Sequence, residues 1–377
     1  MKIAIFGGTF NPVHNEHVNI VKSAKSALKP DKILVVPSYI TPLKTGAITA
    51  SGKERLEMCR LAFCGIDGVE VSDTEMESGG VSYSYLTCEK IKKLYSGAEI
   101  YFIIGADSLA GFHLWKYPER ILNCVTLAVC ARESEDKLNS AVKEYKKRFD
   151  KKFVIIPYVG KKVSSTNVRI SCAAGEDISL SVPERVCDYI SLNGLYKSEY
   201  AEKVKKYLTE ERYAHTLRVV KLALQNAKRL RLDEQSVITA AILHDCAKYI
   251  KGGKELEGFE FPPNVPPPVM HQYTGAYVAE HTFNIKDENI LNAIKYHTSG
   301  RADMSDLEKL IFLADMLEEG RSFEGAEELR KLFYEDVNKC LFSALKHQID
   351  YLKSQNAEIY PLTLQAYQYL KEKGYDE

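Results

Sequence analysis

A glycine pair that directly follows a short apolar run is the feature that most constrains the fold of this chain. Residues 3–6 are typical of a buried strand in a parallel sheet, and residues 18–28 have the pattern of a helix. Between them lies the sequence Gly7-Gly8-Thr9-Phe10-Asn11-Pro12-Val13-His14-Asn15-Glu16-His17. Glycines let backbone N–H groups approach an anion, and the positive end of the helix dipole adds attraction. The junction therefore predicts a phosphate-binding turn in which two histidines, three residues apart, point at one ligand. An ordinary tight turn with two surface histidines is the alternative.

The same alternation of apolar runs and helical segments continues through the first half of the chain. Further strand-like runs lie at residues 32–36, 69–71, 100–104, 125–129 and 153–156. Helix-like segments lie between and after them, at residues 50–64, 84–95, 137–149, 166–174 and 183–192. This pattern predicts an α/β fold over residues 1–196, a doubly wound parallel sheet of the Rossmann type.

Residues suited to nucleotide binding follow three of the predicted strands. Gly105 lets the backbone approach a ligand, Asp107 can accept hydrogen bonds from ribose hydroxyls, and Trp115, the only tryptophan, can stack on a heteroaromatic ring. Taken singly, Asp107 could instead be a helix cap and Trp115 a core residue. Lys44 offers a point charge to a triphosphate. A second phosphate cradle is predicted by hydroxyls at a helix start with an arginine one turn inside, at Ser165, Thr166 and Arg169.

Together these motifs resemble the bacterial nicotinate mononucleotide adenylyltransferases of the nucleotidyltransferase superfamily, over residues 1–196. Ser82-Tyr83, Ala131-Arg132, Pro183-Glu184-Arg185 and Gly194-Leu195-Tyr196 also match the family pattern. The resemblance implies transfer of AMP from ATP to nicotinate mononucleotide in NAD biosynthesis, with Mg²⁺ as cofactor. It implies catalytic roles for His14, His17, Lys44 and Arg169. It implies ATP contacts from Gly7, Gly8, Thr9, Phe10, His14, His17, Gly105, Asp107, Ser165, Thr166 and Arg169. It implies mononucleotide contacts from Tyr83, Thr87, Trp115 and Arg132.

Two positions depart from the family pattern. Glu16 stands where the family usually has glycine, and we expect its side chain either to turn outward or to crowd the ATP site. Leu86 stands where an acidic residue is common. Adenylyl transfer to another phosphate acceptor, such as phosphopantetheine, is the alternative function, although Trp115 and the Ser-Ser-Thr-x-x-Arg stretch speak against it.

Near residue 197 the strand signals stop and amphipathic helices follow. Helical patterns cover residues 199–207, 210–229, 234–248, 272–283, 288–296 and 306–318, with more helix after residue 324. Residues 262–268 hold five prolines and are expected to form a stiff connecting loop. The sequence therefore predicts an all-α domain over residues 197–377.

Polar residues interrupt the apolar faces of these helices. Burying an unpaired carboxylate is costly, so such residues usually coordinate a metal or pair with cations. A lone histidine on an apolar face is more often a satisfied core residue, but an adjacent His-Asp pair with further histidines on separate helices can surround one or two divalent metals. The candidate ligands are His215, His244, Asp245, His271, His297 and Asp315.

This half resembles the HD-type metal-dependent phosphohydrolases, and in particular the bacterial HD-domain hydrolases that cleave diadenosine tetraphosphate symmetrically. The resemblance is carried by Arg212 to Thr216, Leu243 to Lys248, His271, Tyr296 to Arg301 and Ala314 to Arg321. It implies two divalent metals, expected to be iron, with Asp245 bridging them, and two ADP molecules as products. Lys248, Arg301 and Arg321 are the expected phosphate contacts. A nucleotide-sensing module without turnover, or another nucleotide phosphohydrolase, is the alternative.

The composition narrows the class of partner. Basic and acidic residues both number 51, so the net charge is zero, which argues against broad electrostatic attachment to nucleic acid or to anionic membranes. The nine cysteines include no C-x-x-C pair, and neither a leader nor a long apolar span is seen. We therefore expect a reduced, cytoplasmic protein.

Overall fold

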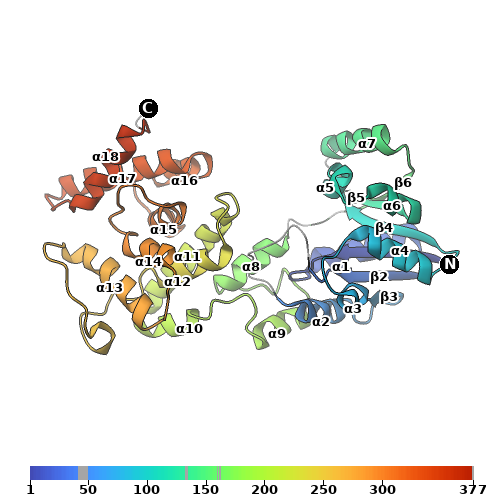
Figure 1. The fold of residues 1–377 in the computed structure, drawn as a ribbon, viewed down its shortest axis with the longest axis horizontal. Coiled ribbons are helices and arrows are strands. Elements are labelled where there is room, and N and C mark those ends of the chain that lie inside the picture. Colours follow the sequence, from blue (N-terminus) through green and yellow to red (C-terminus); the bar gives the residue numbers. More distant parts are fainter. Residues whose placement is uncertain (41–49, 132–134, 159, 161–162, 376–377) are drawn as a thin grey trace. The chain divides into compact units, whose positions relative to one another are not determined.

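Six strands form a single parallel sheet in the order β3-β2-β1-β4-β5-β6 (Figure 1). The computed structural model describes residues 1–40, 50–131, 135–158, 160 and 163–375, without the side chains of 135–137. The strands are β1 (Lys2–Gly8), β2 (Lys32–Pro37), β3 (Val69–Val71), β4 (Glu99–Gly105), β5 (Thr126–Ala131) and β6 (Phe153–Pro157). The predicted doubly wound parallel sheet is confirmed. Because β2 and β4 flank β1 on opposite sides, the connections that leave β1 and β4 diverge, and a crevice opens at their carboxyl ends.

Helices α4, α6 and α7 cover one face of this sheet. Side chains from β1 and β4, such as Ile5 and Phe102, pack there with Cys88 of α4, Ile121 of α6 and Tyr145 of α7. The helices of this part are α1 (Asn15–Leu28), α2 (Gly52–Phe63), α3 (Thr74–Ser78), α4 (Ser84–Leu94), α5 (Ala106–Ala110), α6 (Pro118–Cys124), α7 (Glu135–Phe149), α8 (Ser165–Ala173) and α9 (Glu184–Leu192). The sequence patterns did not predict α3, α5 and α6, because helices of five to seven residues are too short to show a repeating apolar face.

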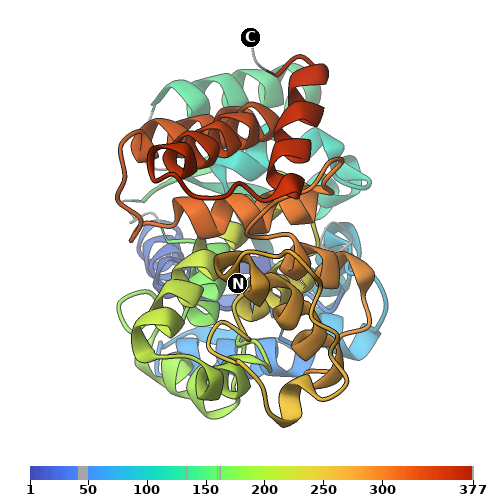
Figure 2. The ribbon, with the colours of Figure 1, turned by 90° about the vertical axis from the view of Figure 1, so that its left-hand side faces the viewer.

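The rest of the described chain is helical, as predicted (Figure 2). Its helices are α10 (Ala201–Val204), α11 (Glu210–Ala227), α12 (Glu234–Leu243), α13 (Pro267–His281), α14 (Glu288–Lys295), α15 (Asp306–Leu317), α16 (Ala326–Glu335), α17 (Val337–Ser354) and α18 (Pro361–Glu372). Helix α12 is buried on all sides over Val237–Leu243, which explains its uniformly apolar sequence. Among the described residues no helix has the length and apolar character needed to cross a membrane.

The described residues divide into two structural units. The N-terminal unit holds residues up to 169 together with 177–196, and the C-terminal unit holds residues 170–176 together with those from 197 onward. The second half of α8 therefore packs with the helical unit, although the sequence pattern placed it with the sheet. Ile170 and Ala173 of this segment belong to the core of the helical unit.

Two helix boundaries differ from the prediction for identifiable reasons. The helix expected over residues 234–248 ends at Leu243, and residues 244–249 form successive tight turns, with N–H groups bonded to carbonyls three residues earlier. These turns are what bring His244 and Asp245 to one interior site. The predicted proline-rich loop is shorter than expected, because Pro267 and Pro268 are the first residues of α13. In the first turn of a helix, the N–H that proline lacks would have no intrahelical acceptor.

Candidate functional site

A cavity of about 840 Å³ lies at the carboxyl ends of β1 and β4. Its lining includes Gly7 and Gly8 of β1 and Gly105 of β4, and at Gly105 the missing side chain leaves open space beside the backbone. This volume is in the range of pockets that enclose a nucleotide-sized ligand. The cavity is therefore the candidate nucleotide site of the N-terminal unit.

The two predicted histidines lie together at the start of α1, but they occupy different positions. Their rings stack with centroids 3.6 Å apart, and the backbone N–H of His14 donates to Nδ1 of His17 at 3.1 Å. His17 lines the cavity, whereas His14 is buried as the N-cap residue of α1 and is not part of the lining. His17 is therefore placed to contact a ligand, and His14 packs against its ring outside the cavity lining.

The other predicted residues of this site fall into four groups. Those that line the cavity with His17 are Gly7, Gly8, Thr9, Phe10, Tyr83, Thr87, Gly105 and Trp115. Ser165 and Arg169 instead brace the turn after β1: Ser165 Oγ donates to Pro12 O, and Arg169 donates to Asn11 O, each at 2.9 Å. Asp107 and Thr166 are exposed and are not part of the lining. Lys44 and Arg132 lie outside the described residues.

The Glu16 side chain does not turn outward, so the first of the two expected arrangements is wrong. Its side chain is 2% exposed and accepts hydrogen bonds from Asn19 Nδ2 at 3.1 Å and from the Tyr158 hydroxyl. Tyr158 follows directly on β6. Glu16 is not part of the cavity lining. The acidic side chain therefore points into the protein, where it connects α1 to the end of β6.

Sequence reasoning gave no role to two charged residues that line the cavity. Glu75 of α3 accepts a hydrogen bond from Thr87 Oγ1 at 2.5 Å, while Leu86, at the position of the missing acid, is exposed. Lys116 Nζ lies 4.1 Å from the centre of the Tyr83 ring. A carboxylate does reach this cavity, but from a segment earlier in the chain than the motif suggested.

Arg55 also carries a structural role that its sequence context did not reveal. It is 5% exposed and donates to the backbone carbonyls of Thr9, Ser38, Tyr39 and Ala50 at 2.6–3.2 Å. Burial lowers the pKa of its guanidinium group. Arg55 therefore ties together the loops that follow β1 and β2. In the sequence, an arginine within an amphipathic helix cannot be told from a surface charge.

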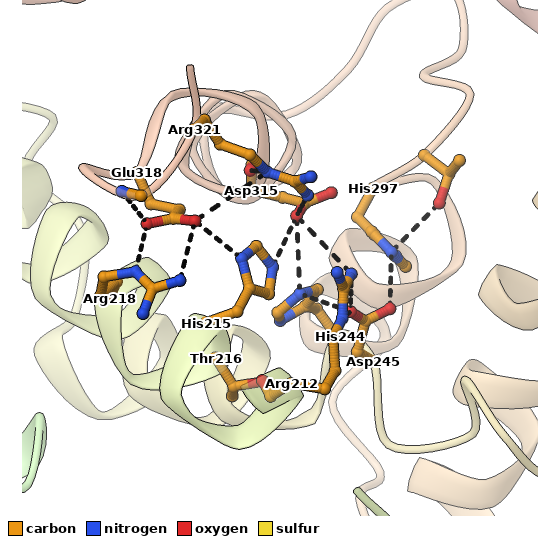
Figure 3. A network of polar contacts seen from close by, with 12 residues as sticks. Arg212, His215, Thr216, Arg218, His244, Asp245, His297, Asp315, Glu318 and Arg321 are labelled. Atoms are coloured by element: carbon orange, nitrogen blue, oxygen red, sulfur yellow. Dashed lines mark hydrogen bonds and ion pairs between the residues drawn. The ribbon is translucent and has the colours of Figure 1, made fainter. Parts of the chain in front are cut away.

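Five of the six predicted metal ligands of the C-terminal unit converge on one centre (Figure 3), and the sixth, His271, lies beside Asp245. His215 comes from α11, Asp315 from α15, and His244 and Asp245 from the turns after α12. His215 Nε2 lies 2.9 Å from Asp315 Oδ1, and His244 Nε2 lies 3.2 Å from Asp245 Oδ2. On the other side of Asp245, its Oδ1 lies 3.2 Å from His271 Nε2 and 3.6 Å from His297 Nε2.

The donor atoms at this centre fit a divalent metal. Nε2 of His215, Nε2 of His244 and Oδ1 of Asp245 are buried and make no hydrogen bond of good geometry within the described part of the chain. His244 and His297 use their other ring nitrogen, Nδ1, to contact backbone carbonyls at 2.7 Å, which leaves Nε2 directed at the centre. Imidazole nitrogens and carboxylate oxygens gathered in this way are typical of a divalent metal site.

The electrostatics of the centre favour the ligating forms of Asp245 and His271. Burial would raise the pKa of Asp245, but the imidazole groups of His244, His271 and His297 beside its carboxylate lower it well below its usual value. Burial lowers the pKa of His271 to about 4, with smaller contributions from His297 and Lys248. Near neutral pH, Asp245 is therefore ionised and His271 is neutral, as metal binding requires.

Two of the three predicted phosphate contacts lie beside the centre. Lys248 Nζ lies 3.0 Å from His271 Nε2, and Arg321 donates to Asp315 Oδ1 at 2.8 Å. Arg301 instead forms a two-point ion pair with buried Glu308, at 2.6 and 2.8 Å, and no contact found among the described residues joins it to the metal ligands.

Two further residues of the centre were not assigned roles from the sequence. Arg212, one turn before His215 on α11, forms an ion pair with Asp245. Glu318, directly after α15, contacts His215 Nδ1 at 3.0 Å. Arg212 lies three residues from His215, and Glu318 lies three residues from Asp315, so each is on the same helix face as a metal-ligand candidate. This spacing is the sequence signal from which their roles could have been predicted.

The comparisons with known proteins agree with both sites. The cytidylyltransferase-like family matches residues 5–170, and the HD domain family matches residues 212–320. A Mycoplasma genitalium protein named "Probable nicotinate-nucleotide adenylyltransferase/Ap4A hydrolase" is 31% identical over 359 residues, which cover 92% of this chain and 97% of that protein.

Shorter relatives match each half separately. A Clostridium tetani protein named "Probable nicotinate-nucleotide adenylyltransferase" is 36% identical over 52% of this chain and 99% of its own length. The "Bis(5'-nucleosyl)-tetraphosphatase, symmetrical" of Bacillus subtilis is 37% identical over 44% of this chain and 93% of its own length. The chain therefore belongs to the family of two-part proteins in which a nicotinate-nucleotide adenylyltransferase is joined to an HD-domain Ap4A hydrolase.

Proposed function

We propose that this chain is a bifunctional enzyme. One activity transfers AMP from ATP to nicotinate mononucleotide, giving nicotinate adenine dinucleotide and pyrophosphate. The other hydrolyses diadenosine tetraphosphate symmetrically to two molecules of ADP. The proposal is carried by one observation. A single chain, matched by a relative over nearly its full length, holds both a cavity large enough for a nucleotide and a cluster of candidate metal ligands.

Positioning and charge neutralisation are the main contributions of the adenylyl-transfer site. The phosphate of nicotinate mononucleotide is already an anionic nucleophile, so its attack on the α-phosphate of ATP needs no protein base. We assign charge stabilisation to His17, with His14 supporting it, and assign Lys44, Arg169 and Mg²⁺ to the same task. The backbone of Gly7, Gly8 and Gly105 allows close approach of the nucleotides.

The acceptor side of the cavity supports a preference for nicotinate over nicotinamide mononucleotide. Trp115 and Tyr83 present aromatic faces to a pyridine ring, and the Lys116 ammonium group above Tyr83 favours an anionic substituent. We expect faster turnover with nicotinate mononucleotide. Steady-state kinetics with the two acceptors in parallel measure this preference, and equal values of kcat/KM would contradict it.

The helical unit provides the ligands for two divalent metals, which we propose to be iron. His215, His244 and Asp315 lie on one side of Asp245, and His271 and His297 lie on the other. The chemistry that such a metal pair supplies when bound is Lewis acidity and activation of water near neutral pH. Asp245 would contact both metals, and Lys248 and Arg321 would hold the polyphosphate chain.

The two activities are assigned to separate parts of the chain. We propose that residues 1–196 form the adenylyltransferase domain and residues 197–377 the hydrolase domain. We also propose that the enzyme acts in the cytoplasm without nucleic-acid or membrane partners. The nine cysteines include no C-x-x-C pair and the net charge is zero, which supports a reducing compartment and small-molecule substrates.

One assay panel tests both activities. ATP is supplied with each mononucleotide in the presence of Mg²⁺, and diadenosine tetraphosphate is supplied with Fe²⁺, Mn²⁺ or Mg²⁺ in separate reactions. We expect nicotinate adenine dinucleotide from the first reactions and ADP alone from the second. Release of ATP and AMP would contradict symmetrical cleavage, and the absence of any dinucleotide product would contradict the assignment of the first domain.

A further inference from the structure

The imidazole ring of His215 lies between two carboxylates of one helix region. Nε2 lies 2.9 Å from Asp315 Oδ1, and Nδ1 lies 3.0 Å from Glu318 Oε1 (Figure 3). Asp315 is close to a second ligand, because its Oδ1 lies 3.9 Å from His244 Nε2. Glu318 faces the opposite side of the ring, away from the other ligands. Asp315 is therefore suited to bind metal, and Glu318 to orient His215.

Glu318 is fixed by contacts that keep it out of the metal centre. It is 1% exposed and accepts from Arg218 Nε at 2.5 Å and from the Gly320 N–H at 2.6 Å. With these donors in place, the oxygen facing His215 has little freedom to move. A carboxylate is an acceptor only, so it holds the proton on Nδ1 and leaves the Nε2 lone pair for a metal.

The other ligand histidines have different partners. Nδ1 of His244 and Nδ1 of His297 contact the neutral backbone carbonyls of Ala241 and Ile294, each at 2.7 Å. His271 has a cation beside it, because Lys248 Nζ lies 3.0 Å from its Nε2 and 3.4 Å from its Nδ1. An anionic partner makes an imidazole a stronger donor to a metal, and a neighbouring cation makes it a weaker one.

We propose that Glu318 is a positioning residue that makes the two metal positions unequal. The position built on His215, His244 and Asp315 binds the first metal equivalent more tightly than the position built on Asp245, His271 and His297. This inference rests on the proposed two-metal centre, but it concerns metal affinity and not turnover.

Metal titration of the full-length, metal-free protein tests this asymmetry. Mn²⁺ is added stepwise, and free Mn²⁺ is measured by its EPR signal. We expect two equivalents of different affinity in the unaltered protein. Glu318→Gln should weaken the tighter equivalent by about 10- to 100-fold, the usual cost of losing a partner of a ligand, and leave the other unchanged. The matched control is Glu319→Gln, at the next residue, where the side chain is 64% exposed; it should alter neither equivalent.

Several results would overturn the proposal. They are two equivalents of equal affinity in the unaltered protein, an unchanged tight equivalent in Glu318→Gln, equal weakening of both equivalents, or the same loss in Glu319→Gln. Circular dichroism of each metal-free variant checks the fold. If Glu318→Gln does not fold, Arg218→Met is measured in its place, because it removes a donor to Glu318 and should weaken the same equivalent by a smaller factor; unchanged affinity there would equally refute the idea.

The titration contains no nucleotide. Failure to hydrolyse diadenosine tetraphosphate would therefore count against the proposed function alone, and a symmetric titration would count against the role of Glu318 alone.

Discussion

Replacing Glu16 by glycine, the residue usual in the family, should destabilise the N-terminal unit. The buried carboxylate accepts hydrogen bonds from Asn19 and Tyr158, and hydrogen bonds to a charged group contribute about 1.5–3 kcal/mol. Glycine in a helix costs about 0.5–1 kcal/mol, and loss of an acid from the first turn of α1 costs about 0.3–1 kcal/mol. We expect a total loss of about 2–5 kcal/mol in the free energy of unfolding.

The single tryptophan makes this loss measurable in the intact protein. Trp115 lies in the N-terminal unit, so its fluorescence during urea unfolding reports that unit alone. With a denaturant slope of about 2 kcal/mol per molar urea, the midpoint should fall by about 1–2.5 M. Glu16→Gln keeps one acceptor oxygen and should lose less. Lys22→Gly, at an exposed position of the same helix, should cost only about 1 kcal/mol, the helix propensity of glycine.

The kinetic expectation follows from the same geometry. Glu16 does not line the cavity, so its removal creates no new room for ATP, and the KM for ATP should not fall in folded protein.

The stability measurement can refute the structural role given to this carboxylate. It would do so if Glu16→Gly left the free energy of unfolding unchanged, or lowered it no more than Lys22→Gly does.

Three further outcomes are expected. His17→Ala should lower the rate of adenylyl transfer by about 100-fold or more and leave Ap4A hydrolysis unchanged in parallel assays, because it removes charge stabilisation from one site only. Asp245→Ala, or an iron chelator followed by added Mg²⁺, should silence hydrolysis and spare adenylyl transfer; slower adenylyl transfer in well-folded Asp245→Ala would show that the two sites are coupled. Tyr145→Phe should stabilise the N-terminal unit by about 1 kcal/mol, because the buried hydroxyl has no hydrogen-bond partner among the described residues. Burial raises the pKa of Tyr145 to about 12, so the unfolded chain ionises first and this group makes stability fall as the pH rises from about 10 to 12. The gain from Tyr145→Phe should therefore be larger at pH 11 than at pH 8, as read from urea midpoints, and an equal gain at both would contradict this assignment.

The strands and long helices could be predicted from the sequence because burial imposes an apolar pattern on them. Residues 69–71, for example, were identified as a strand although β3 has only three residues, because turn residues flank this apolar run on both sides. The clustering of the candidate metal ligands was also predictable, since a histidine or aspartate within an apolar run needs a compensating partner.

What the sequence could not show is the direction in which a charged side chain points. Glu318 and Glu319 are adjacent glutamates with the same local context, yet one is 1% exposed and the other 64% exposed by side chain. The difference arises because His215 and Arg218 of α11 lie opposite Glu318. The direction of the Glu16 side chain could not be predicted for the same reason, because its partner Tyr158 is distant in the sequence.

The segment Thr74–Thr87 brings several polar side chains to the cavity from one continuous stretch of chain. Its members at the cavity are Glu75, Ser82, Tyr83, Ser84 and Thr87, whereas Gly7, Gly8 and Gly105 line it from the ends of β1 and β4. Mutations within this short stretch can therefore change the polar lining of the cavity without altering these strands. Transplanting the stretch between homologues tests whether it governs the choice of phosphate acceptor.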